Sequence, residues 1–212
     1  MEINTDVIHN RFSEMSNFYD GVLAPEEEKN AIGMVLFKPD STNYLLELPI
    51  RDFIKTELEK VTQKKVEFFG FTEIQIKPED VKKLYPEENH EKFIKYIQDH
   101  FETGPIGLVL VAAKDAPQLL NKLKGSVRTG EGVRGKFSNS KPIDDKTLEM
   151  WKGGELDPLT TKQIGIDLFA SNLIHVPDDK NDTMRVMELL IPKHELDLLK
   201  TSVPFVQRWY KN

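Results

Sequence analysis

Two uninterrupted apolar runs constrain the fold of this chain most strongly. They cover Ala31–Phe37 and Ile106–Ala113. An apolar run of this length without alternation is typical of a strand that is buried on both faces. Such strands need packed cover on each side of their sheet. The sequence therefore predicts a sheet with helices packed on its faces.

The segments between and after these runs indicate the order of the elements. Val66–Ile76 alternates in part and is rich in Phe, Ile and Thr, which predicts a further strand. Helical spacing of apolar residues predicts a helix after Ser41 or Thr42, with an apolar stripe of Leu45, Leu48, Phe53, Ile54 and Leu58. The same spacing predicts further helices over Lys77–Leu84, around Phe93–Ile97, over Ala116–Lys124 and over Thr183–Leu190. A short strand starts at Leu173. The β-α-β-α-β-α order favours an α+β fold with a ferredoxin-like antiparallel sheet.

Changes in composition divide the chain into three parts. Residues 1–30 are polar and form an N-terminal extension, and residues 31–190 form the main domain. Residues 138–171 hold many Asn, Asp, Gly and Pro residues and are expected to be an insertion. Residues 191–212 form a C-terminal tail with Phe205, Trp209 and Tyr210. We expect Asp144, Asp145 and Asp157 to be solvated loop residues and not a metal site.

Composition excludes several classes of function. The chain has 212 residues, a formal net charge of −6 and no cysteine. It therefore has no disulfide framework and no thiolate catalysis, and the negative charge argues against general nucleic-acid binding. No apolar stretch is long enough to span a membrane, and the first 30 residues carry no signal-peptide core. We expect a cytoplasmic protein with no membrane partner.

Three short segments carry chemistry. Lys38-Pro39-Asp40 follows the first apolar run, Arg134 lies between Gly132 and Gly135, and His175 ends the segment Asn172-Leu173-Ile174-His175. Neutral imidazole is a nucleophile near pH 7, and lysine and arginine neutralise phosphate oxygens. The two glycines permit a close approach of the backbone. The set predicts a site where a histidine accepts a phosphoryl group. The sequence lacks a P-loop, so any nucleotide is bound by another architecture.

In this order, the segments resemble the nucleoside diphosphate kinase family. The matching pieces are Lys38-Pro39-Asp40, Tyr85, Phe93, Gly104-Pro105, Arg134-Gly135-Lys136-Phe137, Asn172-Leu173-Ile174-His175 and Glu188. The resemblance implies transfer of the terminal phosphate of a nucleoside triphosphate to a nucleoside diphosphate through a phosphohistidine. Nucleoside di- and triphosphates would be the partners. It also implies Mg2+ bound through the nucleotide phosphates, and a homo-oligomer.

The resemblance assigns a role to each matching residue. His175 would carry the phosphate, Glu188 would hold the other ring nitrogen, and Tyr85 would lie beside the ring. Lys38 and Arg134 would bind phosphate, Asn172 the ribose, and Phe93 the base.

Several positions differ from the family pattern. Val176-Pro177 replaces the usual Gly-Ser, and the second arginine and the threonine of the family fall at Asn121 and Val127. Arg128 or Thr129 would then supply the missing phosphate contacts. Two alternatives to an active enzyme remain open. The chain could be a kinase-like module that binds nucleotide without transfer, or an interaction protein that uses the 138–171 insertion and its aromatic tail.

Overall fold

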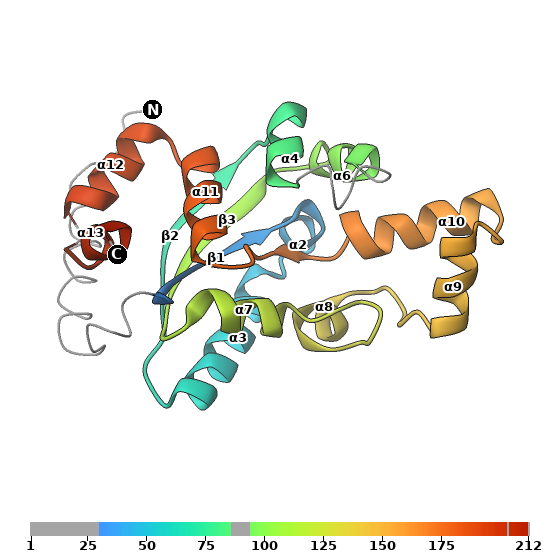
Figure 1. The fold of residues 1–212 in the computed structure, drawn as a ribbon, viewed down its shortest axis with the longest axis horizontal. Coiled ribbons are helices and arrows are strands. Elements are labelled where there is room, and N and C mark those ends of the chain that lie inside the picture. Colours follow the sequence, from blue (N-terminus) through green and yellow to red (C-terminus); the bar gives the residue numbers. More distant parts are fainter. Residues whose placement is uncertain (1–29, 86–93, 203, 212) are drawn as a thin grey trace.

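A four-stranded antiparallel sheet forms the centre of the described part of the chain, which comprises residues 30–85, 94–202 and 204–211 of the computed structural model (Figure 1). The strands are β1 (Ile32–Phe37), β2 (Glu67–Ile74), β3 (Ile106–Ala112) and β4 (Ile174–His175), in the order β2-β3-β1-β4. The two apolar runs form the adjacent central strands β1 and β3. The predicted α+β fold with an antiparallel, ferredoxin-like sheet is confirmed.

Alternation along β1 divides the core into two layers. Met34 and Leu36 pack in one apolar cluster, while Val35 and Phe37 pack in another on the opposite face. The first cluster contains residues of α4 (Pro78–Leu84), α6 (Ile94–Phe101), α11 (Lys180–Leu190), α12 (Lys193–Ser202) and α13 (Pro204–Lys211). The second contains residues of α3 (Glu47–Thr62), α7 (Ala116–Lys124) and α8 (Gly132–Phe137). Because both faces are covered, every residue of β1 is buried. This explains why the run is apolar throughout.

The helices have the following bounds: α2 (Pro39–Asn43), α3 (Glu47–Thr62), α4 (Pro78–Leu84), α6 (Ile94–Phe101), α7 (Ala116–Lys124), α8 (Gly132–Phe137), α9 (Asp145–Gly153), α10 (Pro158–Gly165), the π-helix η3 (Ile166–Ala170), α11 (Lys180–Leu190), α12 (Lys193–Ser202) and α13 (Pro204–Lys211). None of the helices in this part of the chain is long and apolar enough to cross a membrane.

The helix expected after the first strand is broken into two. Leu45 has a left-handed backbone (φ 55°), which separates α2 from α3. As a result, Leu45 and Leu48 are 81% and 67% exposed. The predicted apolar stripe is therefore wrong at these two residues. The buried residues of α3 are Ile50, Ile54 and Leu58.

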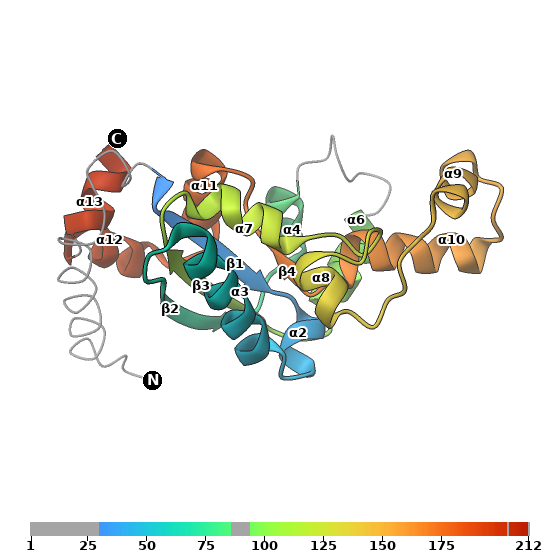
Figure 2. The same cartoon turned by 90° about the horizontal axis from the view of Figure 1, so that it is seen from below.

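The 138–171 segment contains two capped helices and a π-helix. Asp144 accepts a hydrogen bond from the backbone N–H of Thr147, and Asp157 accepts from two backbone N–H groups at the start of α10. These carboxylates are exposed, as predicted, but they are N-caps of helices and not residues of an extended loop. Helices α9 and α10 form an arm that extends away from the sheet, opposite to α12 and α13 (Figure 2).

The last part of the chain packs on the main core. Leu196, Leu199, Val206 and Trp209 are buried within the first apolar cluster. The backbone carbonyl of Trp209 accepts a hydrogen bond from Lys180 Nζ at 2.6 Å. Residues 193–202 and 204–211 therefore form two helices that pack on the main domain.

Candidate functional site

Strand register brings the predicted site residues to one face of the sheet. His175 lies opposite Leu36 in the antiparallel pair of β4 and β1. Opposed residues in such a pair direct their side chains to the same face, and Lys38, two residues after Leu36, follows them. The ring of Tyr85 lies 5.0 Å from that of His175, edge to face. His175, Lys38 and Tyr85 therefore converge, although the segments that carry them lie far apart in the sequence.

The imidazole of His175 is kept neutral by its surroundings. Its Nε2 is buried and has no hydrogen-bond partner, while the residue as a whole keeps partial exposure. Burial is the largest cause of a pKa of His175 well below its ordinary value. Nearby positive charges lower that pKa further, and they belong to Lys38, Lys124, Arg134 and Arg185. A neutral imidazole among cations suits a nucleophile that attacks a phosphate.

The side chain of Lys38 is buried and acts as a clamp, because it links the end of β1 to residues 169–172 through hydrogen bonds. Its side chain is 0% exposed. Nζ donates hydrogen bonds to the carbonyl oxygens of Phe169 (3.1 Å) and Ala170 (3.0 Å) and to Oδ1 of Asn172 (2.7 Å). An ammonium group has three N–H donors, so this lysine has none left for a phosphate. In this structure these N–H groups hold residues 169–172, and the phosphate contact expected of Lys38 stays a prediction.

The amide of Asn172 is used in the same clamp. Besides accepting from Lys38, it donates through Nδ2 to the carbonyl of Leu168 at 2.7 Å. Asn172 is 2% exposed. Its side chain joins the π-helix η3 to β1 instead of facing a sugar. The ribose contact expected of Asn172 stays a prediction.

Asp40 fixes the segment that leads into β4. Its Oδ2 accepts from the backbone N–H of Leu173 (2.8 Å) and from Ser171 Oγ (3.3 Å), and Oδ1 lies 3.0 Å from Nε2 of His100. Leu173 has a left-handed backbone (φ 70°), which is costly for a branched residue. The carboxylate therefore stabilises the bend that sets the direction of His175.

Arg134 lies beside β4, the strand that ends in His175. Its Nη2 donates to the carbonyl of Ile174 at 2.9 Å, and burial lowers its pKa. The flanking glycines permit close packing of α8 against the end of α7 and the 125–130 loop. A Cβ on Gly132 would lie 2.4 Å from the carbonyl oxygen of Leu123, and one on Gly135 would lie 1.8 Å from the carbonyl carbon of Gly130.

Two cations that act on His175 are not among the predicted site residues. Lys124 ends α7, and Arg185 lies on α11. Both lower the pKa of His175. Lys124 is three residues after Asn121, and the spacing along a helix places such residues on neighbouring faces. That spacing was the available signal for Lys124, whereas Arg185 had none.

Three predicted residues, Glu188, Arg128 and Thr129, are not brought to His175. Glu188 is exposed and its carboxylate lies 3.5 Å from Lys200. Since Nε2 of His175 has no partner, the predicted bond from Glu188 to this nitrogen is wrong. The buried residues of α11 are Thr183, Val186, Met187 and Leu190, and Glu188 lies outside that set.

The two loop residues proposed as substitutes also lie elsewhere. Arg128 is exposed and lies 3.8 Å from Asp145 at the start of α9, while Thr129 donates to Glu131. Neither contributes to the shifted pKa of His175. Phe93 falls outside the described residues.

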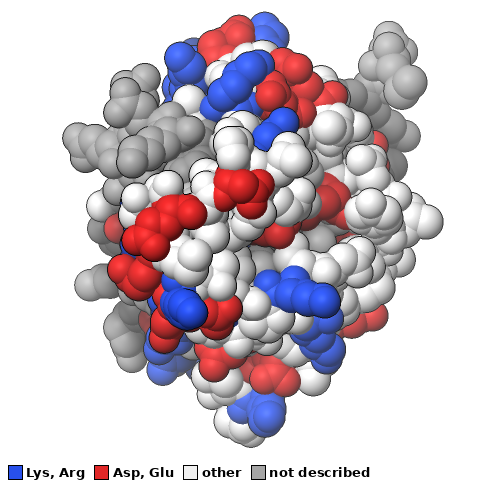
Figure 3. Space-filling view, turned by 90° about the vertical axis from the view of Figure 1, so that its right-hand side faces the viewer, with Lys and Arg blue, Asp and Glu red and all other residues white. Residues whose placement is uncertain are grey.

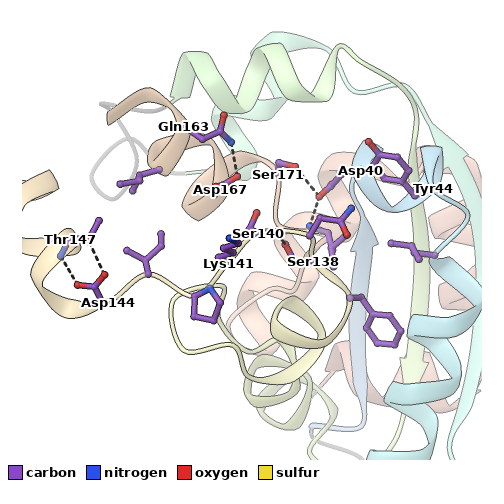
Figure 4. Close-up of a pocket in the computed structure, with 17 residues that line it drawn as sticks. Asp40, Tyr44, Ser138, Ser140, Lys141, Asp144, Thr147, Gln163, Asp167 and Ser171 are labelled. Carbon is purple, nitrogen blue, oxygen red and sulfur yellow. Dashed lines mark hydrogen bonds between the residues drawn. The ribbon is translucent and has the colours of Figure 1, made fainter. Parts of the chain in front are cut away.

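A separate pocket of about 560 Å³ lies between α2, the 138–144 segment and the base of the arm (Figure 4). Asp40 and Ser171 line its inner side, and Asp144 and Gln163 line the arm side. Neither His175 nor Arg134 is among its described lining residues. On the face toward which the arm points, acidic and basic side chains are mixed (Figure 3).

Comparison with known proteins identifies the fold. No protein-family model matches the chain, and no curated protein matches it. Solved structures do match. A nucleoside diphosphate kinase from Aquifex aeolicus is 13% identical, with a TM-score of 0.54 over 78% of this chain and 97% of that chain. One from Halobacterium salinarum, in complex with CDP, is 18% identical, with a TM-score of 0.53 over 78% and 90%. One from Borrelia burgdorferi, with bound vanadate and ADP, is 14% identical, with a TM-score of 0.53 over 77% and 88%.

The chain has the nucleoside diphosphate kinase fold. The resemblance inferred from the ordered motifs is confirmed at the level of the fold. Within this nucleoside diphosphate kinase fold, the 138–171 segment ends in the π-helix that binds Lys38. A π-helix at this point is consistent with the frequent occurrence of such turns at functional sites.

Proposed function

We propose that this protein binds nucleoside phosphates and moves the terminal phosphate through His175. One observation carries the proposal: a neutral, half-buried imidazole at the end of β4 is surrounded by cations. An anion placed there would offset their mutual repulsion. The cations therefore favour binding of a phosphate ligand, and the neutral ring of His175 can act as the nucleophile.

The reaction needs few protein groups. A ring nitrogen of His175 attacks the terminal phosphorus, the bond from phosphorus to the bridging oxygen breaks, and the nucleoside diphosphate leaves with the bonding electrons. A second diphosphate reverses these steps and regenerates the free imidazole. Because Nε2 is buried, we assign the attack to Nδ1. Phosphoryl transfer depends mainly on positioning and on neutralising the moving oxygens.

Neighbouring residues would support the ring in different ways. Arg134 holds the strand through Ile174 and adds positive charge beside His175. Tyr85 packs against the ring edge and limits its rotation. Lys38 would act through its charge and through its hold on η3, because its N–H groups are engaged.

The solved structures of the same fold support the substrate class. The Borrelia burgdorferi kinase binds ADP with vanadate as a transition-state mimic, and the Halobacterium salinarum kinase binds CDP. We extend nucleotide binding to this chain on the strength of the shared fold and the cationic site.

A protein-built magnesium site does not fit the described residues. No group of three or more His, Cys, Asp or Glu side chains there could hold a metal ion. The described groups that act on His175 are cations, which repel a metal. Magnesium therefore enters this proposal only as part of the Mg–nucleotide substrate, and we derive no step through it.

A coupled assay of phosphate transfer tests the proposal. The full chain is mixed with MgATP and GDP, and formation of GTP is measured. We expect turnover by the wild-type chain and none by His175→Ala, with ADP binding retained in calorimetry. Wild-type protein that binds ADP but transfers nothing would exclude the phosphotransferase.

Binding without transfer is the second candidate function. It is favoured by the clamp of Lys38 and Asn172, which leaves neither side chain turned to a ligand. ADP binding that is equal in wild type and His175→Ala, with no GTP formed by either, would favour it.

A further inference from the structure

The cations around His175 differ in how firmly the protein already holds them. Lys38 is fully engaged by oxygen acceptors of Phe169, Ala170 and Asn172. Arg134 is largely buried and bound to the carbonyl of Ile174. Neither can turn toward a new anion without breaking a bond inside the fold.

Arg185 is also held by several bonds. Its guanidinium donates to Oδ1 of Asp182 from Nε (2.9 Å) and Nη2 (2.6 Å), and Nη1 donates to the carbonyl of Lys83. A planar guanidinium bound on two sides is fixed in orientation. Arg185 therefore contributes a stationary charge.

Lys124 differs from the others. Its described ion pair is with Asp178, and the distance from Nζ to Oδ1 is 3.8 Å. This length exceeds that of a charge-assisted hydrogen bond. The carboxylate of Asp178 is 78% exposed, whereas the Lys124 side chain is only 17% exposed. Water therefore weakens the pair on the side of Asp178.

Asp178 is already bound by other groups. Its Oδ1 accepts from Nδ2 of Asn121 at 3.0 Å, and its backbone N–H donates to Asp182 at 3.0 Å. If Lys124 moved away, Asp178 would keep its hydrogen bond from Asn121 and its contact with water. The ammonium can therefore turn from Asp178 to a phosphate without leaving a buried group unsatisfied.

The backbone fixes Lys124 close to Arg134. The end of α7 crosses the start of α8 so closely that only glycine fits at position 132, against the carbonyl of Leu123. Burial is the largest cause of the lowered pKa of Lys124, and the positive charge of Arg134 lowers that pKa further. An anion between them would relieve this repulsion.

We propose that Lys124 is the mobile cation that binds the phosphate of the nucleotide at His175. The inference rests on the proposed function and names a phosphate ligand for that site. Lys124 can reach the anion because Asp178 holds it weakly, and its place at the end of α7 keeps it beside Arg134.

The test compares ADP binding and phosphate transfer by the full chain in wild type, Lys124→Gln, Lys124→Arg and Lys122→Gln. Lys122 is exposed on the same helix and serves as the matched control. Loss of a hydrogen bond to a charged group predicts ADP binding that is at least about 10-fold weaker in Lys124→Gln. Lys124→Arg should recover most of it, and Lys122→Gln should bind like wild type.

A titration of His175 by NMR separates a site role from a structural one. Removing a neighbouring positive charge should raise the pKa of His175 in Lys124→Gln and leave it unchanged in Lys122→Gln. Equal ADP binding by wild type and Lys124→Gln would overturn the role of Lys124 while leaving the proposed function intact. Absence of ADP binding in wild type would overturn both.

Discussion

Replacing Lys38 by methionine tests whether this lysine is a structural clamp. Methionine is long, unbranched and apolar, so it can fill the space of the lysine stem against Tyr85 and Phe101. The substitution removes the hydrogen bonds from Nζ to the carbonyls of Phe169 and Ala170 and to Asn172. Oxygen acceptors at a buried site are then left without their donor.

The size of the effect follows from these contacts. A hydrogen bond to a charged group contributes about 1.5–3 kcal/mol, and releasing a buried ammonium offsets part of that loss. We expect the free energy of unfolding to fall by about 3 kcal/mol. For a chain of this length, that corresponds to a melting temperature lower by about 6–12 °C.

The assay is urea unfolding followed by circular dichroism, without nucleotide, together with hydrogen exchange over residues 166–173. Lys38→Met should lower the stability and speed up exchange in that segment. Lys83→Met is the control, because Lys83 is exposed and pairs with Asp80 on the surface of α4. An unchanged unfolding midpoint and unchanged exchange in Lys38→Met would refute the clamp.

Three further predictions follow from the site. In the unfolded chain His175 is protonated near pH 6.5, whereas burial keeps it neutral in the folded protein. Below a pH of about 6.5, the free energy of unfolding should therefore fall by about 1.4 kcal/mol per pH unit because of this residue. Urea titrations at several pH values should show a shallower fall of the unfolding free energy for the His175→Gln variant. Asp40→Asn should lower the unfolding free energy by about 1–3 kcal/mol and speed hydrogen exchange at Leu173, because it weakens the bonds that hold this bend; no change in either would count against that role. Gly135→Ala should destabilise the fold strongly and reduce ADP binding in calorimetry, since its Cβ would overlap the backbone of Gly130; wild-type stability of this variant would contradict the close approach.

Much of the fold was predictable because burial leaves a clear pattern. A strand covered on both faces must be apolar throughout, so Ile32–Phe37 and Ile106–Ala112 were recognisable. Helix α7 was predicted with its observed bounds, since Gly125 with its positive φ ends it. The break at Leu45 was not predictable, because a leucine gives no indication of a left-handed backbone.

The site was predictable only in outline. The ordered motifs located His175, Arg134 and Tyr85, which the sheet register and the packing of Tyr85 bring together. The engagement of Lys38 was not predictable, because its acceptors include backbone carbonyls, which every residue possesses. Glu188 failed because a shift of one residue along α11 decides whether a side chain faces the core, as Met187 does, or lies beside Lys200 of α12.

The most direct test of the account is the phosphoenzyme itself. The full chain is mixed with MgATP without an acceptor, and its intact mass is measured before and after brief acid treatment. The account predicts one added phosphoryl group that is lost in acid, maps to Nδ1 of His175 and is absent from His175→Ala. A folded wild-type chain that binds MgATP but gains no phosphoryl group, or gains it on another residue, would contradict the central role of His175.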